Sequence, residues 1–569
     1  MFVRSARFRR AVFASSPMKF MLALVTVCAM TLGSTAVAGA GSLYDSMTHS
    51  NVTIPIGPKA SKPLPKTPAI KTTSGPVKGV MHKNTAEFLG IPYAAPPVGS
   101  LRWMPPTPFG KWHGVLKATS FGNVCTQGGS SGVTGSEDCL FLNIYVPRFK
   151  KNSNKHHGGG LPVMFWIHGG GLTSGAGSLY DPTPLLRPEN VIVVTINYRL
   201  GYLGFFAESA LDAESHDAGN YGLMDQQFAM QWVQNNIAAF GGDPSNVTIF
   251  GESAGGHSVY CQLASPTAAG LFSHAIAESG SYLIFDAFIQ PIVTLAVGES
   301  TGSALIPGGD SVASGLGCTT AACLRALSNA DVFNVQPGTL YAFVDGTLLT
   351  QTPGEAFASG NFNKVPVIAG TNHDEWRLFV AQQYDGSGHP ILTETEYNDA
   401  AIALWGPLLG PIIPSIYPYA SYSSGGVALG ASGTDGIFAC SARNGDALLS
   451  KFTTTYAYEF NDENAPPHQS DLPGLTFPLG AFHSAELQYL FDIGFFQELN
   501  ATQLQLSAAM VSYWTNFAVS GDPNGGTLPT WSLYDPMIDQ FQSLIPPTPV
   551  VESTFNTDHQ CDSFWNLIP

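Results

Sequence analysis

A short glycine-rich turn, set between a predicted strand and a predicted helix, leaves few folds open to this chain. Residues 246–250 (N-V-T-I-F) have the composition of a strand, and a helix-compatible stretch continues through Leu263. Between them lies Gly251–Gly255 (G-E-S-A-G), which places Ser253 in the turn. A turn this tight strains the serine backbone, projects its hydroxyl above the sheet and directs the positive end of the helix toward it. The pattern predicts that Ser253 is a nucleophile.

The same spacing occurs a second time, at Gly128–Gly132 (G-G-S-S-G). That stretch is rich in Ser and Gly, and the sequence predicts no strand before it. Because the motif has meaning only between a strand and a helix, we interpret this second match as coincidence.

The sequence around the turn indicates an α/β fold. Two continuous apolar runs, Val163–Ile167 and Val191–Ile196, are typical of strands buried on both faces, as in a parallel sheet. Met224, Phe228 and Trp232 recur every four residues, which predicts a helix packed on that sheet. Alternating strands and helices favour a large, mostly parallel central sheet with helices on both faces. Since no second linker divides the chain, we expect one domain with long insertions.

Composition excludes several classes of protein. The 569 residues are 44% hydrophobic and 12% charged, which is enough apolar material for a substantial core. The formal charge of −16 makes nucleic acid an improbable partner, since bulk electrostatics would repel its phosphates. Past the N-terminal region, no stretch reaches the length of apolar residues that a membrane span needs, so we expect no stable span in the mature chain.

The N-terminus has the features of a targeting signal. A basic start is followed by an apolar stretch from Phe20 to about Leu32 and by Ala36–Ala38 (A-V-A), an A-x-A cleavage pattern. Residues 1–38 therefore predict a cleaved secretory signal peptide, and the protein is expected to be extracellular, or periplasmic in a Gram-negative bacterium. Residues 39–72 are rich in Gly, Ser, Thr and Pro and predict a flexible segment, which leaves residues 73–569 as the folded domain.

A second glycine-rich stretch directly follows another predicted strand. His168–Gly171 (H-G-G-G) directly follows the Val163–Ile167 strand. A nucleophilic serine forms a tetrahedral oxyanion, and consecutive glycines let backbone N–H groups approach that oxygen without interference from side chains. A phosphate-binding loop is the competing interpretation, but no G-K-[ST] follows. We expect Gly170, Gly171 and Ala254 to donate the three N–H groups.

Several longer motifs make the resemblance specific: the sequence resembles the type-B carboxylesterase/lipase family, which includes the cholinesterases and has the α/β-hydrolase fold. The resemblance covers essentially residues 73–569. It is carried by Phe88–Tyr93 (F-L-G-I-P-Y), Ser136–Asn143 (S-E-D-C-L-F-L-N), Asn197–Gly201 (N-Y-R-L-G), Gly219–Leu223 (G-N-Y-G-L), Gly242–Pro244 (G-D-P), Trp514–Ala518 (W-T-N-F-A) and Gly521–Pro523 (G-D-P).

Chain order and this resemblance together imply the remaining catalytic residues. In the α/β-hydrolase fold the order is Ser, then Asp or Glu, then His. Val365–Gly370 predicts a strand, and the acidic pair that follows it implies Glu375 as the catalytic acid, with Asp374 as the alternative. Trp376 stands where the family usually has Gly and is expected to reshape the pocket wall. His483 matches the family's catalytic histidine.

These residues define a mechanism that requires no metal or organic cofactor. His483 would take the proton of Ser253 and return it to the leaving alcohol, while Glu375 orients the imidazole, so that an acyl-enzyme forms and is hydrolysed. The adjacent His156 and His157 fall in a polar insert, Lys150–Gly160, that predicts a solvated surface loop rather than a metal site.

The resemblance also implies three disulfides and a structural ion pair. The pairs are Cys125–Cys139, Cys318–Cys323 and Cys440–Cys561, which an oxidising compartment permits. Cys261 is left over and is expected to be a buried thiol rather than a second nucleophile. Arg102 and Glu137 match a family ion pair, so Glu137 is interpreted as structural.

The segment between Cys125 and Cys139 bears on the substrate. It is short, polar and free of aromatic residues, so it has neither the choline-stacking tryptophan of cholinesterases nor the amphipathic lid of the family's lipases. We expect a preference for soluble or short- to medium-chain esters, small or polymeric. Two alternatives stay open: a binding protein of the same fold, and a hydrolase that acts on an amide, carbamate or specialised polyester bond. Oligomeric state is not predicted.

Overall fold

The computed structural model describes residues 65–129, 132–148, 160–188, 190–281, 292–303, 306–467, 474–494 and 497–568. The predicted signal peptide, the greater part of the predicted flexible segment and the His156–His157 loop lie outside these residues. All the described residues belong to one compact unit.

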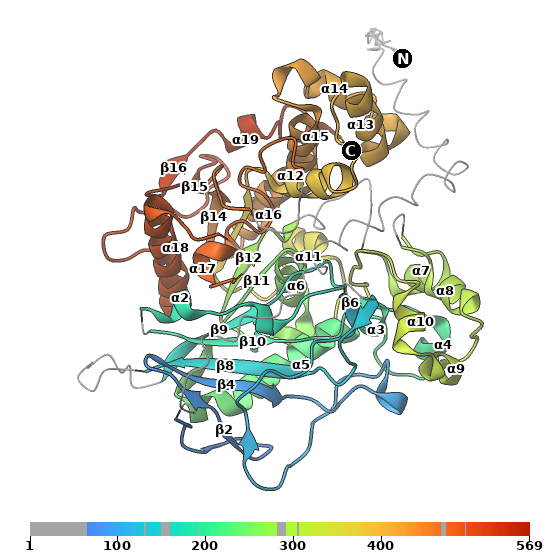
Figure 1. Cartoon of the computed structure of the whole chain (residues 1–569), viewed down its shortest axis with the longest axis vertical. Helices are drawn as coiled ribbons and strands as arrows, with labels where there is room; N and C mark the ends of the chain where they lie inside the picture. The colour runs from blue at the N-terminus through green and yellow to red at the C-terminus, as the bar shows by residue number, and fades with distance from the viewer. Residues whose placement is uncertain are drawn as a thin grey trace, which may run out of the picture. The chain divides into compact units, whose positions relative to one another are not determined.

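A large mixed sheet of eleven described strands forms the centre of this unit (Figure 1). Its middle strands, from β10 through β15, run parallel, and antiparallel strands flank them at both edges. In spatial order the strands are β16 (Val550–Glu552), β15 (Phe541–Leu544), β14 (Thr455–Phe460), β13 (Val367–Asn372), β12 (His274–Glu278), β11 (Gly242–Glu252), β9 (Leu161–Ile167), β10 (Ile192–Ile196), β8 (Phe141–Pro147), β4 (Thr85–Pro92) and β3 (Val80–Met81).

Helices cover both faces of the sheet, as the sequence predicts. Successive residues of β9 point to opposite faces: Val163 and Phe165 join the core beneath α5 (Tyr221–Asn236) and α6 (Ala254–Ala264), whereas Trp166 joins the core beneath α18 (Ala501–Ser520). All seven residues of β9 are buried, which explains its uninterrupted apolar run. Met224 and Trp232 are buried in α5 and Phe228 packs against the same core, so the predicted helix is confirmed.

The remaining elements occupy the connections between these helices and strands. The small strands are β1 (Ile70–Lys71), β2 (Pro76–Lys78), β5 (Leu116–Lys117), β6 (Gln127–Gly129) and β7 (Gly132–Thr134). The other α-helices are α2 (Thr183–Leu186), α3 (Gly201–Gly204), α4 (Ser209–Asp212), α7 (Leu295–Ser300), α8 (Gly309–Gly315), α9 (Ala321–Ala326), α10 (Asn329–Phe333), α11 (Pro353–Ser359), α12 (Glu375–Val380), α13 (Glu394–Leu409), α14 (Ile413–Ile416), α15 (Gly425–Gly433), α16 (Cys440–Leu449), α17 (Leu487–Leu490) and α19 (Phe555–Asp558).

Two predicted boundaries require correction. Residues 65–72 belong to the folded unit, because β1 pairs with β2 and Lys66 forms a bridge with Val80, so the domain begins before the predicted residue 73. The strand predicted for Val365–Gly370 is β13, which starts and ends two residues later. Hydrophobicity located the strand β13 to within two residues, whereas β1 has no apolar period and is defined by its pairing with β2.

The stretch around the second serine motif also differs from the prediction. β6 and β7 pair there as an antiparallel hairpin, whereas the sequence predicts no strand before the motif. Since no helix follows this hairpin, Gly128–Gly132 still lacks the strand–turn–helix context of the first motif.

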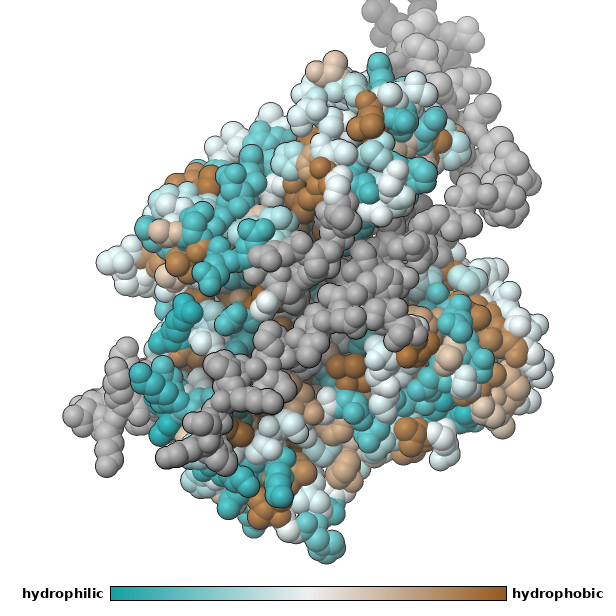
Figure 2. Space-filling model, in the orientation of Figure 1, coloured by the Kyte–Doolittle hydropathy of each residue, from teal (hydrophilic) through white to brown (hydrophobic). Residues whose placement is uncertain are grey.

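Among the described residues, no single helix has the length and apolar composition to cross a membrane. One pair of helical segments, Glu394–Leu409 and Ile413–Ser421, reaches that length and composition only when the two are taken together, and the pair is bent by 110°. On the face shown in Figure 2, hydrophilic and hydrophobic side chains are interspersed.

The predicted cross-links are present. Disulfides join Cys125 to Cys139, Cys318 to Cys323 and Cys440 to Cys561. Cys261 is a buried free thiol in α6, and burial raises its pKa well above the usual range, which makes it a poor nucleophile. The predicted ion pair also forms, with Arg102 Nη2 2.6 Å from Glu137 Oε1.

Candidate active site

Ser253 occupies the turn between β11 and α6. Its φ of 56° and ψ of −123° lie in a region that non-glycine residues rarely adopt, as the tight turn requires. The serine N–H donates to the Glu278 carbonyl on the neighbouring strand β12, at 2.9 Å, which helps hold this conformation. Ser253 is buried, with 3% of its surface exposed.

The glycines of the motif permit close contact between this turn and strand β9. A Cβ atom at Gly255 would lie 2.0 Å from the carbonyl oxygen of Ile167, and one at Gly251 would lie 2.5 Å from the same atom. Both distances are shorter than any stable contact. Glycine is therefore needed at both positions to seat the nucleophile directly against the end of β9.

The glycine-rich loop that follows β9 lies beside the nucleophile. A Cβ atom at Gly169 would approach the Cβ of Ser253 to 3.1 Å. Gly170 and Gly171 have φ values of 109° and 60°, which favour glycine, and Ala254 is the first residue of α6. The loop, the nucleophile and the helix N-terminus thus meet at one end of the sheet.

The acid predicted from chain order lies just past the end of β13. Glu375 begins α12, and its carboxylate is fully buried. Its Oε1 accepts hydrogen bonds from Thr371 Oγ1 and from the backbone N–H of Asn372, both at 2.8 Å. Its Oε2 is 2.5 Å from Nδ1 of His483, so the carboxylate is oriented from one side and holds the imidazole on the other.

His483 bridges the acid and the nucleophile's strand. Its Nε2 lies 3.2 Å from Oε1 of Glu252, the residue immediately before Ser253. The imidazole is almost completely buried. The structure therefore brings Glu375 and His483 into contact from positions 108 residues apart in the chain, and it places His483 against the residue that precedes Ser253.

The neighbouring acid has different partners. Asp374 Oδ1 lies 2.8 Å from Nη2 of Arg377, and its Oδ2 accepts the N–H of Ala481 at 2.9 Å. These contacts, together with the attraction of His373 and Arg377, hold the pKa of Asp374 below its usual value although burial alone would raise it. Since the Asp374 carboxylate is used in this way, the geometry favours Glu375 as the acid.

Three further buried carboxyl groups surround the histidine and the acid. Burial raises the pKa of Glu252 and Glu486 well above the usual value, and repulsion by Glu375 and Glu278 adds to the effect in both. Burial likewise raises the pKa of Glu278 to about 8, although a hydrogen bond from Trp514 Nε1 at 3.0 Å opposes the rise. Burial therefore disfavours negative charge on these three groups beside His483.

Replacing Glu278 by Gln is expected to change the pH dependence of stability. The folded state keeps the Glu278 proton between about pH 4.5 and 8, whereas the unfolded state has lost it, so this group makes stability fall as pH rises through that window. Glu278→Gln retains the acceptor for Trp514 and should raise the free energy of unfolding at pH 8 by about 4 kcal/mol while changing it little at pH 4.5. Urea unfolding at both pH values measures the difference; an equal effect at both would contradict the assignment.

Aromatic rings enclose the imidazole. The rings of Phe379 and Phe438 lie 5.1 Å and 5.2 Å from that of His483. Trp376 packs on Phe379 at 4.6 Å, and a Cβ at Gly433 would approach Trp376 to 2.2 Å. The tryptophan that replaces the usual glycine is thus part of an aromatic wall behind the histidine.

Sequence reasoning missed Glu252, Glu278 and Glu486. Glu252 lies inside the serine motif and Glu486 lies three residues after His483, so proximity to a selected residue was the available signal. With 41 acidic residues in the chain, nothing local distinguishes Glu278.

One other group of described side chains has the spacing of metal ligands, since ligand atoms of His373, Glu459 and His559 lie within 4.8 Å of one another.

Comparison with known proteins shows that this chain is similar to carboxylesterases. The profile of the carboxylesterase family matches residues 66–564. The chain is 35% identical to human (Homo sapiens) cocaine esterase, over 81% of this chain and 83% of that protein. It is 36% identical to mouse (Mus musculus) acylcarnitine hydrolase over 79% and 81% of the two chains, and 34% identical to rat (Rattus norvegicus) liver carboxylesterase 1F over 82% and 88%.

A solved structure of a PNB esterase superposes with a TM-score of 0.70 and 29% identity, covering 87% of this chain and 99% of that one. The sheet and helices therefore form an α/β-hydrolase fold. The chain belongs to the carboxylesterase family, and it is a serine hydrolase that acts on ester bonds.

Proposed function

We propose that this protein is a secreted carboxylesterase that works through Ser253, Glu375 and His483 and prefers soluble esters of short or medium chain length. The observation that carries the proposal is the position of His483. Its Nδ1 lies 2.5 Å from Oε2 of Glu375, and its Nε2 lies 3.2 Å from Oε1 of Glu252, the residue before Ser253. Acyl transfer needs an acid on one nitrogen of the histidine and the nucleophile beside the other nitrogen, and this position of His483 supports that arrangement.

Each residue has one task in the proposed reaction. Nε2 of His483 accepts the hydroxyl proton of Ser253 as the serine attacks the ester carbonyl, and the same proton then passes to the leaving alcohol. Glu375 fixes the imidazole tautomer that carries a proton on Nδ1 and stabilises its charged form. Water then repeats the sequence on the acyl-enzyme, which releases the carboxylic acid and restores Ser253.

The oxyanion of both tetrahedral intermediates would be stabilised by backbone N–H groups. We assign this role to Gly170, Gly171 and Ala254, because the glycine loop lies against Ser253 and Ala254 opens α6. Losing one such donor typically costs about 10²–10³ in rate.

The preference for soluble esters is supported by the segment between Cys125 and Cys139. It forms the short hairpin β6–β7, in which Val133 is the one large apolar residue and the other described residues are small or polar. Such a hairpin offers little surface for attachment to a lipid droplet.

The substrate preference predicts a particular chain-length profile. With p-nitrophenyl esters, kcat/KM should be highest between acetyl and octanoyl and should fall by about tenfold or more for palmitoyl. With tributyrin, the rate should level off at the solubility limit instead of rising beyond it. A sharp rise once droplets form would contradict the preference while leaving the esterase activity intact.

Secretion is supported by the N-terminal signal pattern and by the three disulfides, which persist in oxidising compartments. If the signal is cleaved after Ala38, N-terminal sequencing of protein recovered from the export compartment or medium should begin at Gly39. Recovery of the chain only in the reducing cytosol, with an intact N-terminus, would contradict the proposal.

A further inference from the structure

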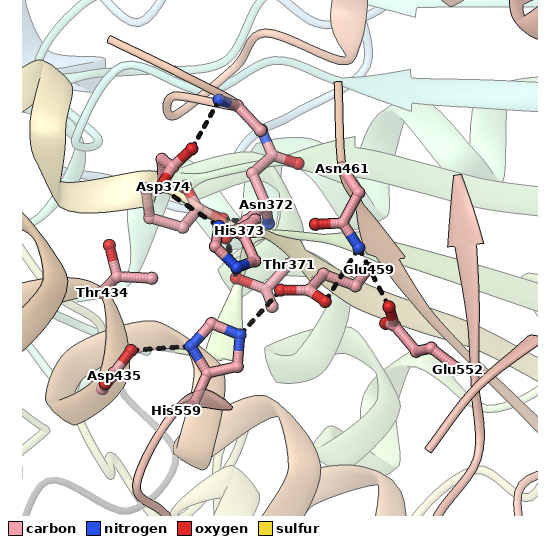
Figure 3. Close-up of polar contacts among 12 residues, drawn as sticks. Thr371, Asn372, His373, Asp374, Thr434, Asp435, Glu459, Asn461, Glu552 and His559 are labelled. Carbon is pink, nitrogen blue, oxygen red and sulfur yellow. Dashed lines mark hydrogen bonds and ion pairs between the residues drawn. The ribbon is translucent and has the colours of Figure 1, made fainter. Parts of the chain in front are cut away.

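Two histidines and a glutamate converge at the carboxyl ends of β13 and β14 (Figure 3). His373 directly follows β13, Glu459 is the penultimate residue of β14, and His559 directly follows α19. One possible ligand atom of each lies within 4.8 Å of the other two. Glu459 and His559 are buried, whereas one third of the His373 side chain is exposed, so the group is reached from the His373 side.

The orientation of the two imidazoles is that of metal ligands. Nδ1 of His559 lies 2.7 Å from Asp435 Oδ1, and Nδ1 of His373 lies 3.2 Å from Asp374 Oδ1. Histidines that bind metals usually donate their other ring N–H to a carboxylate in this way, which fixes the tautomer and leaves Nε2 as the ligand. Nε2 of His559 faces Glu459, and Figure 3 shows the His373 ring between Asp374 and Glu459.

Acidic side chains also gather around the group. Asn461 Nδ2 donates to Glu459 Oε2 at 3.0 Å and to Glu552 Oε2 at 3.1 Å, which brings a fourth acidic side chain to a cluster that already holds Asp374, Asp435 and Glu459. Arg377 is the one arginine or lysine that forms a described ion pair with these four acids, through Asp374. The charged forms of His373 and His559, which these acids stabilise, carry the balancing positive charge until a divalent ion takes the place of their protons.

We propose that His373, Glu459 and His559 bind a divalent transition-metal ion, and that Zn²⁺ fits these ligands best. Two imidazoles and one carboxylate are a ligand set that Zn²⁺ prefers, whereas Mg²⁺ and Ca²⁺ require oxygen ligands. A water molecule would complete the coordination on the exposed His373 side.

Binding exchanges a proton for the ion. In the structure Nε2 of His559 is 2.7 Å from Glu459 Oε1, a hydrogen-bonded separation. The ion would replace the proton shared by these two atoms, which passes to solvent, and would require them to move apart to about 3.3 Å, given metal–ligand bonds of about 2.0–2.2 Å.

The proposed ion has a structural role and not a catalytic one. It would join the residue two positions before Glu375 to β14 and to the C-terminal segment, which the Cys440–Cys561 disulfide already holds against the fold. Binding should therefore restrain the loop that carries the proposed catalytic acid and raise the melting temperature by about 2 °C at a hundredfold excess over Kd.

The test is a titration of the EDTA-treated, full-length protein with ZnCl₂, followed by isothermal calorimetry. We expect one ion per chain, and a loss of affinity of about 100-fold in both His559→Gln and His373→Gln. His373→Gln keeps the test valid if the buried His559 variant does not fold, because His373 is partly exposed. His216→Gln, which alters a histidine that contacts Glu214 instead of this cluster, should bind as the unaltered protein does.

The adjacent pair His156–His157, outside the described residues, supplies the decisive control. Stoichiometric binding that survives His156→Gln/His157→Gln and is lost in His373→Gln supports the proposal. Binding that disappears with the His156–His157 pair, or that is unchanged in both cluster variants, overturns it, as does the absence of binding at millimolar Zn²⁺. None of these results depends on which residues perform ester hydrolysis.

Discussion

Ser253→Ala is expected to lower kcat/KM for p-nitrophenyl butyrate by about 10⁵–10⁶, to the residual rate that binding and oxyanion stabilisation alone provide. Removing the hydroxyl deletes the atom that forms the acyl-enzyme, so no other residue of the site can substitute for it. Initial rates over a series of substrate concentrations, with the wild type measured beside the variant, give the ratio.

The control for this variant is its folding, because Ser253 has a strained backbone. Alanine adopts the same φ with no more difficulty than serine and adds no atom, so the melting temperature should stay within a few degrees of the wild type. A variant that melts normally and retains more than a hundredth of the activity would show that another residue is the nucleophile.

Glu375→Gln is expected to lower kcat by about 10³–10⁴ with a much smaller change in KM. The glutamine oxygen can still accept from Thr371 and Asn372, which leaves its NH₂ group facing Nδ1 of His483. The imidazole then carries its proton on Nε2, the wrong nitrogen for accepting the proton of Ser253. Steady-state kinetics on a short-chain ester separates the two parameters.

Asp374→Asn is the matched control, since it makes the same chemical change one residue away. Its carboxylate pairs with Arg377 and caps the loop at Ala481, and neither contact reaches the imidazole of His483. We expect a loss of activity of less than about tenfold, accompanied by lower thermal stability. If Asp374→Asn lowered kcat by about 10³ and Glu375→Gln did not, Asp374 and not Glu375 would be the catalytic acid.

The parts of this structure that the sequence predicts are those in which one local pattern has one physical cause. The apolar run Val163–Ile167 predicts a strand buried on both faces because few other elements bury every residue. The strand–turn–helix context of Gly251–Gly255 predicts the strained Ser253 for a similar reason, since those glycines leave room for the end of β9. The positions of Glu375 and His483 required the family's chain order in addition.

The contacts that the sequence could not predict are those between distant segments. The hydrogen bond from Trp514 to Glu278 joins residues 236 positions apart, and the bond from His559 to Asp435 spans 124 positions. The local composition of these segments does not predict that they are in contact in the fold. The same reason explains the domain boundary: β1 has no apolar period of its own and becomes a strand only by pairing with β2.

The most direct measurement of the central claim is the location of a covalent adduct. The purified protein is treated with a fluorophosphonate, which phosphonylates activated serines, then digested, and the modified peptide is sequenced by mass spectrometry. The account predicts a single adduct on Ser253, formed by the wild type and by Asp374→Asn, and formed at least about 100-fold more slowly by Glu375→Gln. An adduct on any other residue, or none on a folded protein that hydrolyses esters, would contradict it.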